Sequence, residues 1–138
     1  MADVVDRATR SRMMSGIRGK NTIPERLVRS YLHRSGLRFR LHVKGLPGRP
    51  DLVLPRYKAI VEVHGCFWHR HPHCRFATTP ATNRRFWGAK FRENTTRDRR
   101  NRRRLEQLGW RVFTIWECEI KESRKLAILV RRIRAVVP

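Results

Sequence analysis

Residues 49–69 read RPDLVLPRYKAIVEVHGCFWH, with two short apolar runs on either side of a polar turn. The runs at 51–54 and 59–63 are rich in Val, Ile and Leu, which is typical of strands. Pro55 opens the turn between them, so we expect these two strands to pair as a hairpin.

Helices and further strands are expected on both sides of this hairpin. Upstream, Thr22 with Glu25 three residues later has the pattern of a capping box, and Gly36 marks the end of that helix. A short strand is expected at 39–43. The helix should bury one stripe of side chains, made of Leu27, Val28, Tyr31 and Leu32.

Downstream of the hairpin, residues 84–108 are predicted to form one long helix that ends at Gly109, followed by a strand at 110–116. A final helix should bury four apolar side chains, which are Leu126, Leu129, Val130 and Ile133. The chain is therefore predicted to be an α/β protein, with one mixed β-sheet flanked by helices. The basic segment 1–20 is expected to be an arm that orders on DNA, leaving 21–138 as a single domain.

The long helix carries a stripe in which apolar ends flank a polar middle. Spacings of four and three place seven residues on one face, which are Trp87, Phe91, Asn94, Asp98, Asn101, Leu105 and Leu108. A carboxylate on the inward face needs a partner, because burying it unpaired costs several kcal/mol. The alternative is that Asp98 is solvated and pairs with Arg102.

The amino-acid composition indicates which class of partner the protein binds. The chain has 138 residues and 33 Lys and Arg against 11 Asp and Glu, which gives a net charge of +22. Such an excess favours nucleic acid as the partner. The sequence contains no apolar run long enough for a membrane span and begins without an apolar signal region. We therefore expect a cytoplasmic protein associated with the nucleoid, with its three cysteines reduced.

Asp51 is the candidate metal ligand. Hydrolysis of a phosphodiester needs a hard cation, and carboxylates hold such cations. Glu62 and His64 lie two residues apart on the next strand and hence on one face. This arrangement resembles the proline, aspartate and acid-x-lysine signature of a large nuclease fold, with His64 at the place of the lysine. A Pro-Asp pair that only forms a turn is the structural alternative.

Residues 64–74 contain four histidines, two cysteines and two adjacent aromatic residues. The run HGCFWH, after LPGRPD and before LGWRVFTIWEC, resembles the very short patch repair endonuclease family, within the restriction-endonuclease-like nucleases. The resemblance runs from about residue 7 to residue 120. It implies an enzyme that nicks one DNA strand 5′ of the thymine in a T·G mismatch, which arises from deaminated 5-methylcytosine.

The resemblance implies a catalytic Mg²⁺ held by Asp51 and by the backbone carbonyl of Val63. Glu25 matches an acidic residue of the family that holds water on the metal. Its place in the capping box explains the presence of a glutamate at this position equally well. At the position of Glu62, members of the family usually carry an apolar residue that is not a ligand. Glu62 is expected either to join Asp51 on the metal or to pair with an arginine.

The resemblance also assigns catalytic histidines. His69, the second histidine of HGCFWH, is expected to be the general base, since an imidazole exchanges a proton near neutral pH. His64 and Asp98 are implied around the active site, with Asp98 orienting a histidine or compensating its charge.

A structural Zn²⁺ site is predicted from cysteine and histidine spacing. Cys66, His71 and Cys74 follow a C-x4-H-x2-C pattern, and Cys118 comes from the end of the last strand. His73 is the competing imidazole, but it is adjacent to Cys74, and neighbouring residues in an extended chain point in opposite directions. The alternative is three thiols without a metal.

Mismatch recognition is expected from apolar side chains that enter the base stack. The resemblance places Phe67, Trp68 and Trp87 on the major-groove side and Met14 on the minor-groove side. The alternative is that the three aromatic residues are ordinary core.

The partner is then double-stranded DNA with a T·G mismatch, and not a membrane. We expect a monomer, with a functional link to a DNA cytosine methyltransferase. Two other functions are compatible with parts of the sequence: a nuclease of the same fold with another specificity, and a zinc-stabilised DNA-binding module without catalysis.

Overall fold

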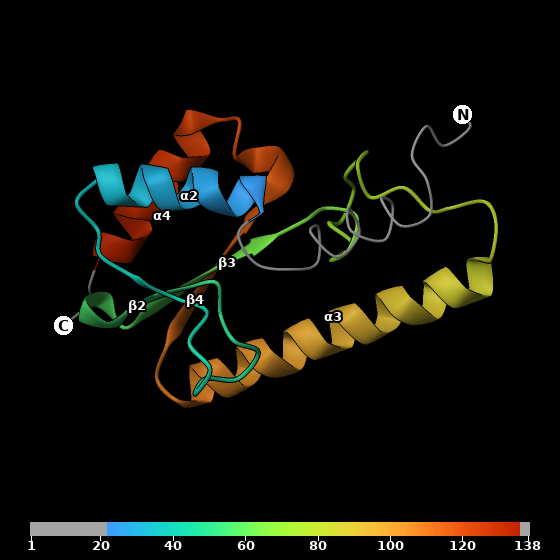
Figure 1. Ribbon diagram of the computed structural model, residues 1–138, viewed down its shortest axis with the longest axis horizontal. Helices are drawn as coiled ribbons and strands as arrows, with labels where there is room; N and C mark the ends of the chain where they lie inside the picture. Colours follow the sequence, from blue (N-terminus) through green and yellow to red (C-terminus); the bar gives the residue numbers. More distant parts are fainter. Residues whose placement is uncertain (1–21, 136–138) are drawn as a thin grey trace.

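The computed structural model describes residues 22–135, which form a four-stranded sheet in the order β1-β2-β3-β4 with helices on both faces (Figure 1). The strands are β1 (Arg40–Leu41), β2 (Leu52–Leu54), β3 (Ala59–His64) and β4 (Arg111–Trp116). The helices are α2 (Ile23–Arg34), α3 (Arg84–Gln107) and α4 (Ser123–Arg134), with 3₁₀ turns at Pro55–Tyr57 and Glu117–Glu119. The predicted α/β class, a mixed sheet flanked by helices, is confirmed.

The sheet topology brings two loops to one edge. β1, β2 and β3 are antiparallel neighbours, which confirms the predicted hairpin, and Leu52 faces Val61 in it. β4 runs parallel to β3, with His64 opposite Trp116. A parallel neighbour requires a long crossover, and α3 lies in that connection. The segments that follow β3 and β4 therefore start side by side.

The side chains of β3 alternate between two hydrophobic cores. Ala59 and Val61 belong to the core formed with α2 and α4, whereas Ile60 packs with Leu105 of α3. Figure 1 shows α2 and α4 together on one side of the sheet and α3 on the other. The residues that continue the α3-facing row of β3, Glu62 and His64, are consequently presented towards α3.

Helix ends follow the predicted capping signals. Thr22 Oγ1 accepts a hydrogen bond from the Glu25 N–H at 3.4 Å, which caps α2. Gly36 and Gly109 follow α2 and α3 with φ of +88° and +93°. Glycine has no Cβ to clash in this left-handed region, so both helices can end there.

Three expectations about buried positions and strand length are wrong. The strand expected at 39–43 is reduced to Arg40–Leu41, because His42 adopts a φ of +46°, outside the β region. Leu27 is 52% exposed, since the buried residues of α2 are Glu25, Val28 and Leu32. Leu108 is 56% exposed because it is the cap residue beyond the last helical turn.

The predicted arm 1–20, with Met14, lies outside the described residues, so its boundary with a domain of 21–138 stays a prediction. No helix within residues 22–135 combines the length and apolar character that crossing a bilayer requires.

Candidate active site and metal centre

Asp51 lies directly before β2, where continuing the β2–β3 register places it opposite Glu62. Its Oδ2 accepts a hydrogen bond from the Val63 N–H at 2.8 Å. Burial raises the pKa of Asp51 to about 7 in spite of this hydrogen bond, and the charges of Glu25 and Glu62 contribute to the rise. A buried carboxyl group close to two others favours a bound cation, because the cation neutralises the charge that burial penalises.

Three potential ligands converge at this point. Glu25, His42 and Asp51 each offer one atom, and these atoms lie within 4.8 Å of one another. Glu25 is 3% exposed, and its Oε1 lies 2.5 Å from His42 Nε2 and 3.1 Å from Arg29 Nη2. Two carboxylates and one imidazole are a donor set that fits a divalent cation.

The raised pKa of Asp51 predicts how stability depends on pH in magnesium-free buffer. The folded-state pKa of about 7 lies above the ordinary value of 3.8, so the folded state binds more protons than the unfolded state between these values. The contribution of Asp51 to stability is therefore fully present below pH 3.8 and is lost as pH rises through about 7, by an amount on the order of 4 kcal/mol. Asp51→Asn should remove this slope, which thermal denaturation of zinc-loaded wild type and variant between pH 5 and 8 would measure. A difference between the two proteins that does not change with pH would contradict it.

Glu62 and His64 form a second contact on the α3-facing side of β3. The Oε2 atom of Glu62 lies 3.1 Å from His64 Nε2, and both side chains are largely buried. The His64 ring stacks on His69 at 4.0 Å between centroids and meets Trp116 edge-on at 5.2 Å. His64 is thus held by a carboxylate, a second imidazole and an indole.

His69 is paired with Asp98 across the gap between the loop and α3. Its Nδ1 lies 2.6 Å from Asp98 Oδ2, so the carboxylate on the inward stripe has an imidazole as its partner. The alternative pairing of Asp98 with Arg102 is wrong, because Arg102 donates instead to the Val112 carbonyl and to Thr114 Oγ1. A carboxylate at Nδ1 keeps the proton there and leaves Nε2 as the basic nitrogen.

His64, His69 and Asp98 also form a group whose ligand atoms lie within 4.8 Å of one another. It is a second place near the active site with metal-ligating side chains. The contact between His69 and Asp98 occupies one of its imidazoles, which favours Asp51 as the carboxylate for a hard cation.

The predicted zinc ligands come together at the edge where β3 and β4 end. Four side chains offer ligand atoms within 4.8 Å of one another, namely Cys66, His71, Cys74 and Cys118. His71 Nδ1 lies 3.7 Å from the Cys66 sulfur and 3.4 Å from the Cys118 sulfur. His73, the competing imidazole, is not in this group among the described residues. Three thiols and one imidazole form the donor set of a closed tetrahedral zinc site.

Burial raises the pKa of the Cys66 thiol to about 12 and also raises the pKa of Cys118. Without a cation both sulfurs therefore favour the protonated form. A metal ion would reverse this preference, because it binds the thiolate.

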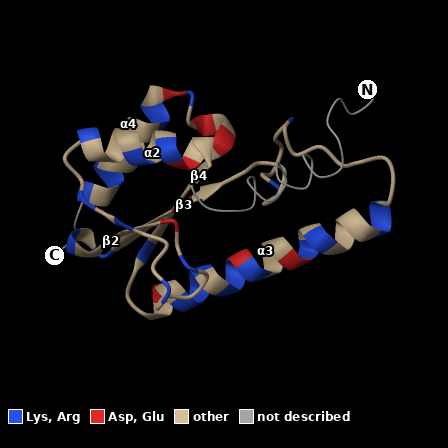
Figure 2. Ribbon diagram, viewed as in Figure 1, with Lys and Arg blue, Asp and Glu red and all other residues tan. Residues whose placement is uncertain are grey.

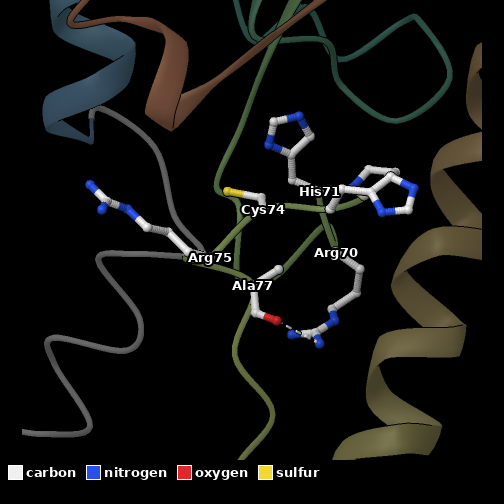
Figure 3. Close-up of a pocket in the computed structure, with 7 residues that line it drawn as sticks. Arg70, His71, Cys74, Arg75 and Ala77 are labelled. Atoms are coloured by element: carbon white, nitrogen blue, oxygen red, sulfur yellow. Dashed lines mark hydrogen bonds between the residues drawn. The ribbon is translucent and has the colours of Figure 1, made fainter.

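Arg70 fixes the loop that leads from these cysteines towards α3. Its guanidinium donates to the Ala77 and Thr78 carbonyls at 2.9 and 2.8 Å, and Figure 3 shows it directed at Ala77. The same guanidinium lies 4.0 Å from the centroid of the Phe91 ring on α3. The residue between His69 and His71 thus ties the loop to the helix that carries Asp98.

The three predicted recognition aromatics form one cluster. Phe67 lies 5.0 Å from Trp68 and 5.8 Å from Trp87, and Trp68 lies 5.7 Å from Trp87, between ring centroids. Trp68 is 7% exposed and its carbonyl accepts from Asn94 Nδ2 at 3.3 Å. Phe86, beside Trp87, is 59% exposed. Trp68 is therefore buried within this cluster of rings, whereas Phe67 and Trp87 are only half-buried.

Lys and Arg residues occur along the length of α3 (Figure 2). The exposed arginines of its second half are Arg97, Arg99, Arg100, Arg102, Arg103 and Arg104. They lie on the same helix as Asp98, so this positive charge and the candidate active site share one helix.

Sequence reasoning missed His42 and Arg70. A single histidine in an expected strand carries no signal, and the positive φ that directs His42 to Glu25 is set by the folded backbone. Trp116 was also missed. Its ring stacks on that of His71 at 4.2 Å and meets that of His64 edge-on, so it contacts both the cysteine group and the candidate active site. The register of two parallel strands would have located it, since Trp116 pairs with His64.

The fold matches that of a solved nuclease. The catalytic domain of the homing endonuclease I-Bth0305I superposes with a TM-score of 0.55 at 23% identity, over 82% of this chain and 94% of that chain. This likeness shows the fold of a nuclease, and carboxylates and imidazoles gather at the strand ends of that fold in this chain.

The chain belongs to the family of the DNA mismatch endonuclease Vsr, whose family model matches residues 2–75. It is 47% identical over 126 residues to the DNA mismatch endonuclease Vsr of Escherichia coli (strain K12), covering 91% of this chain and 80% of that protein. It is also 43% identical over 133 residues to the type II nicking enzyme V.XorIIP of Xanthomonas oryzae pv. oryzae, covering 96% and 97%. Membership of this family excludes the noncatalytic DNA-binding module.

Proposed function

We propose that this protein nicks one strand of double-stranded DNA 5′ of the thymine in a T·G mismatch. The observation that carries the proposal is the contact between His69 and Asp98, which ties the end of HGCFWH to α3 next to the aromatic cluster. His69 is also close enough to Asp51 for its charge to lower the pKa of that carboxyl group. Two relatives carry names that agree, one a mismatch endonuclease and the other a nicking enzyme. The lesion would be deaminated 5-methylcytosine.

We assign the catalytic metal site to Asp51, with the Val63 carbonyl as a second ligand and Glu25 holding water. Mg²⁺ bound there would neutralise the charge that develops on the phosphate. The Val63 N–H already donates to Asp51, so the backbone of residue 63 and the carboxylate are adjacent.

We assign Glu62 the role of hydrogen-bond partner of His64, because its carboxylate lies 3.1 Å from that imidazole. Ligation of the metal is the alternative, since the charge of Glu62 also raises the pKa of Asp51. The magnesium dependence of Glu62→Ala separates the two roles, and an unchanged dependence would exclude ligation.

We assign His69 as the general base, and His64 as the residue that positions it by stacking on its ring. Nε2 of His69 takes the proton of the attacking water, and Asp98 at Nδ1 stabilises the imidazolium that results. His64 lies parallel to the His69 ring within 7°, which fixes the plane of the base.

Asp98→Asn is expected to lower the single-turnover nicking rate by roughly 100-fold while leaving DNA affinity unchanged. An asparagine carries no charge to stabilise the imidazolium, and its amide can hold the wrong tautomer of His69. Glu93→Gln, at an exposed acid on the same helix, is the matched control and should retain full activity. A rate within about threefold of wild type would remove Asp98 from the mechanism.

We propose that Zn²⁺ occupies the group of Cys66, His71, Cys74 and Cys118. Such an ion would join the loop after β3 to the turn after β4. Its role is structural, because all four ligands come from the protein and leave no open position.

We propose that Phe67, Trp68 and Trp87 form the major-groove wedge at the mismatch, with Met14 entering from the minor groove. A T·G pair unstacks more easily than a matched pair, so an aromatic wedge can select it. The clustering of the three rings beside the active-site loop supports this role.

Phe67→Ala should reduce the preference for T·G over T·A duplexes by about tenfold, the equivalent of one lost aromatic–base contact. Affinity for matched DNA should change little, since arginine–phosphate contacts carry it. Phe67 is a better test than Trp68, whose removal from a buried position would also leave a cavity. Phe76→Ala, at a 49% exposed phenylalanine, is the control. Equal losses on both duplexes, measured by competition binding, would contradict the wedge.

We further propose that the protein acts as a monomer near the nucleoid and serves DNA modified by a cytosine methyltransferase. One active site suffices for a single-strand nick. Two relatives are named as type II nicking enzymes, which agrees with such a link.

The test is an assay with magnesium and end-labelled duplexes that carry one T·G mismatch or a matched T·A pair in several contexts. A nick 5′ of the mismatched thymine is expected. Equal cutting of matched duplexes would instead indicate a nuclease of other specificity.

A further inference from the structure

We infer that His42 is a nitrogen ligand of the catalytic metal centre, where its imidazole joins the Asp51 carboxylate and the Val63 carbonyl. The inference rests on the proposed function, because that function places a divalent metal at Asp51.

The side chain of His42 is directed at the carboxylates from a fixed position. Its Nε2 lies 2.5 Å from Glu25 Oε1, its side chain is 12% exposed, and its ligand atom lies within 4.8 Å of those of Glu25 and Asp51. A cation held by Asp51 at these separations comes within bonding distance of His42 Nε2 after only a small side-chain movement, while Glu25 holds a water beside it.

The backbone of His42 is tied to the same centre. Its N–H donates to the Asp51 carbonyl at 3.3 Å, so the two residues are linked through both main chain and side chain. Its φ of +46° is uncommon for a residue with a Cβ and costs energy. This conformation ends β1 and turns the imidazole towards Glu25.

The charge around the centre suits a neutral third ligand. Arg29 Nη2 lies 3.1 Å from Glu25 Oε1 and compensates one of the carboxylates. Against a divalent cation, a neutral imidazole completes the donor set without adding a further buried negative charge.

An imidazole ligand changes which metal the centre prefers. Mg²⁺ favours oxygen donors, whereas first-row transition ions accept imidazole nitrogen readily. The centre should therefore bind Mn²⁺ more tightly than Mg²⁺. A His42 that only hydrogen-bonds Glu25 would give no such preference.

Mn²⁺ is the probe that tests this ligand, in zinc-loaded protein. Its binding is followed by electron paramagnetic resonance, and pulsed measurements report nitrogen coupling to the bound ion. Wild type is expected to show imidazole nitrogen coupling. His42→Gln should lose this coupling and bind Mn²⁺ about tenfold more weakly, with a smaller effect on Mg²⁺. His33→Gln, at an exposed histidine of α2, is the matched control and should retain both.

The possible outcomes distinguish an error in the assignment of His42 from an error in the proposed metal site at Asp51. Mn²⁺ that binds through Asp51 without nitrogen coupling in wild type would overturn the assignment of His42 and leave the metal site in place. Coupling that persists in His42→Gln would assign it to another histidine and also overturn the inference. Mn²⁺ binding that is unaffected by Asp51→Asn would overturn the metal site itself. The coupling in wild type labelled with a nitrogen isotope in histidine tests the inference independently of any variant's folding.

Discussion

Asp51→Asn is expected to lower the nicking rate on a T·G duplex by about 1,000-fold or more, because the centre loses the charge that holds its metal. Asparagine keeps the size of the side chain and can still accept a hydrogen bond from the Val63 N–H, so the fold should persist. DNA binding should remain within about twofold, since arginine–phosphate contacts determine affinity. Single-turnover nicking and fluorescence anisotropy on the same duplex measure the two quantities.

Glu106→Gln is the control for Asp51→Asn, because it removes one negative charge from an exposed position on α3. It should nick at the wild-type rate. If Asp51→Asn nicks within about tenfold of wild type at saturating Mg²⁺, another carboxylate holds the metal and the proposed centre is wrong.

Cys118→Ser should lose the zinc and lower the free energy of unfolding by more than ~3 kcal/mol. Cys118 follows β4 and Cys66 follows β3, so a zinc ion bound by both would join two segments that are otherwise connected mainly through the sheet. The loop between Cys66 and Cys74 carries His69, and nicking should therefore fall together with stability. Zinc content by mass spectrometry and thermal denaturation measure the effect.

His73→Ala is the control for Cys118→Ser. His73 neighbours Cys74 but stands outside the ligand group, so this variant should keep one zinc ion and wild-type stability. A Cys118→Ser protein with full zinc content and an unchanged melting temperature would contradict the structural role of the ion.

Local patterns predicted most of the fold. The Pro55 turn between two apolar runs gave the hairpin, and Thr22 and Gly109 gave helix ends, because these signals act through nearby backbone atoms. Leu27 was misassigned because the inward face of α2 also carries a buried glutamate, Glu25. Hydrophobic periodicity cannot predict the burial of a carboxylate that is held inside by contacts with His42 and Arg29.

The candidate site was predictable where spacing or periodicity fixes direction. Helical periodicity placed Asp98 inward, and the structure shows it on His69. Cysteine and histidine spacing predicted a group that the structure brings together. The contact of His42 with Glu25 was not predictable, since it depends on a left-handed backbone and on two segments that are distant in sequence.

We propose that the protein has two separate metal centres, a catalytic one at Asp51 and a structural one at the cysteines. Anomalous scattering from crystals of the zinc-loaded protein soaked in Mn²⁺, recorded at wavelengths that distinguish the two metals, tests it most directly. We expect a zinc peak between Cys66 and Cys118 and a manganese peak against Asp51. A manganese peak between His69 and Asp98 with none at Asp51, or no zinc among the cysteines, would contradict it.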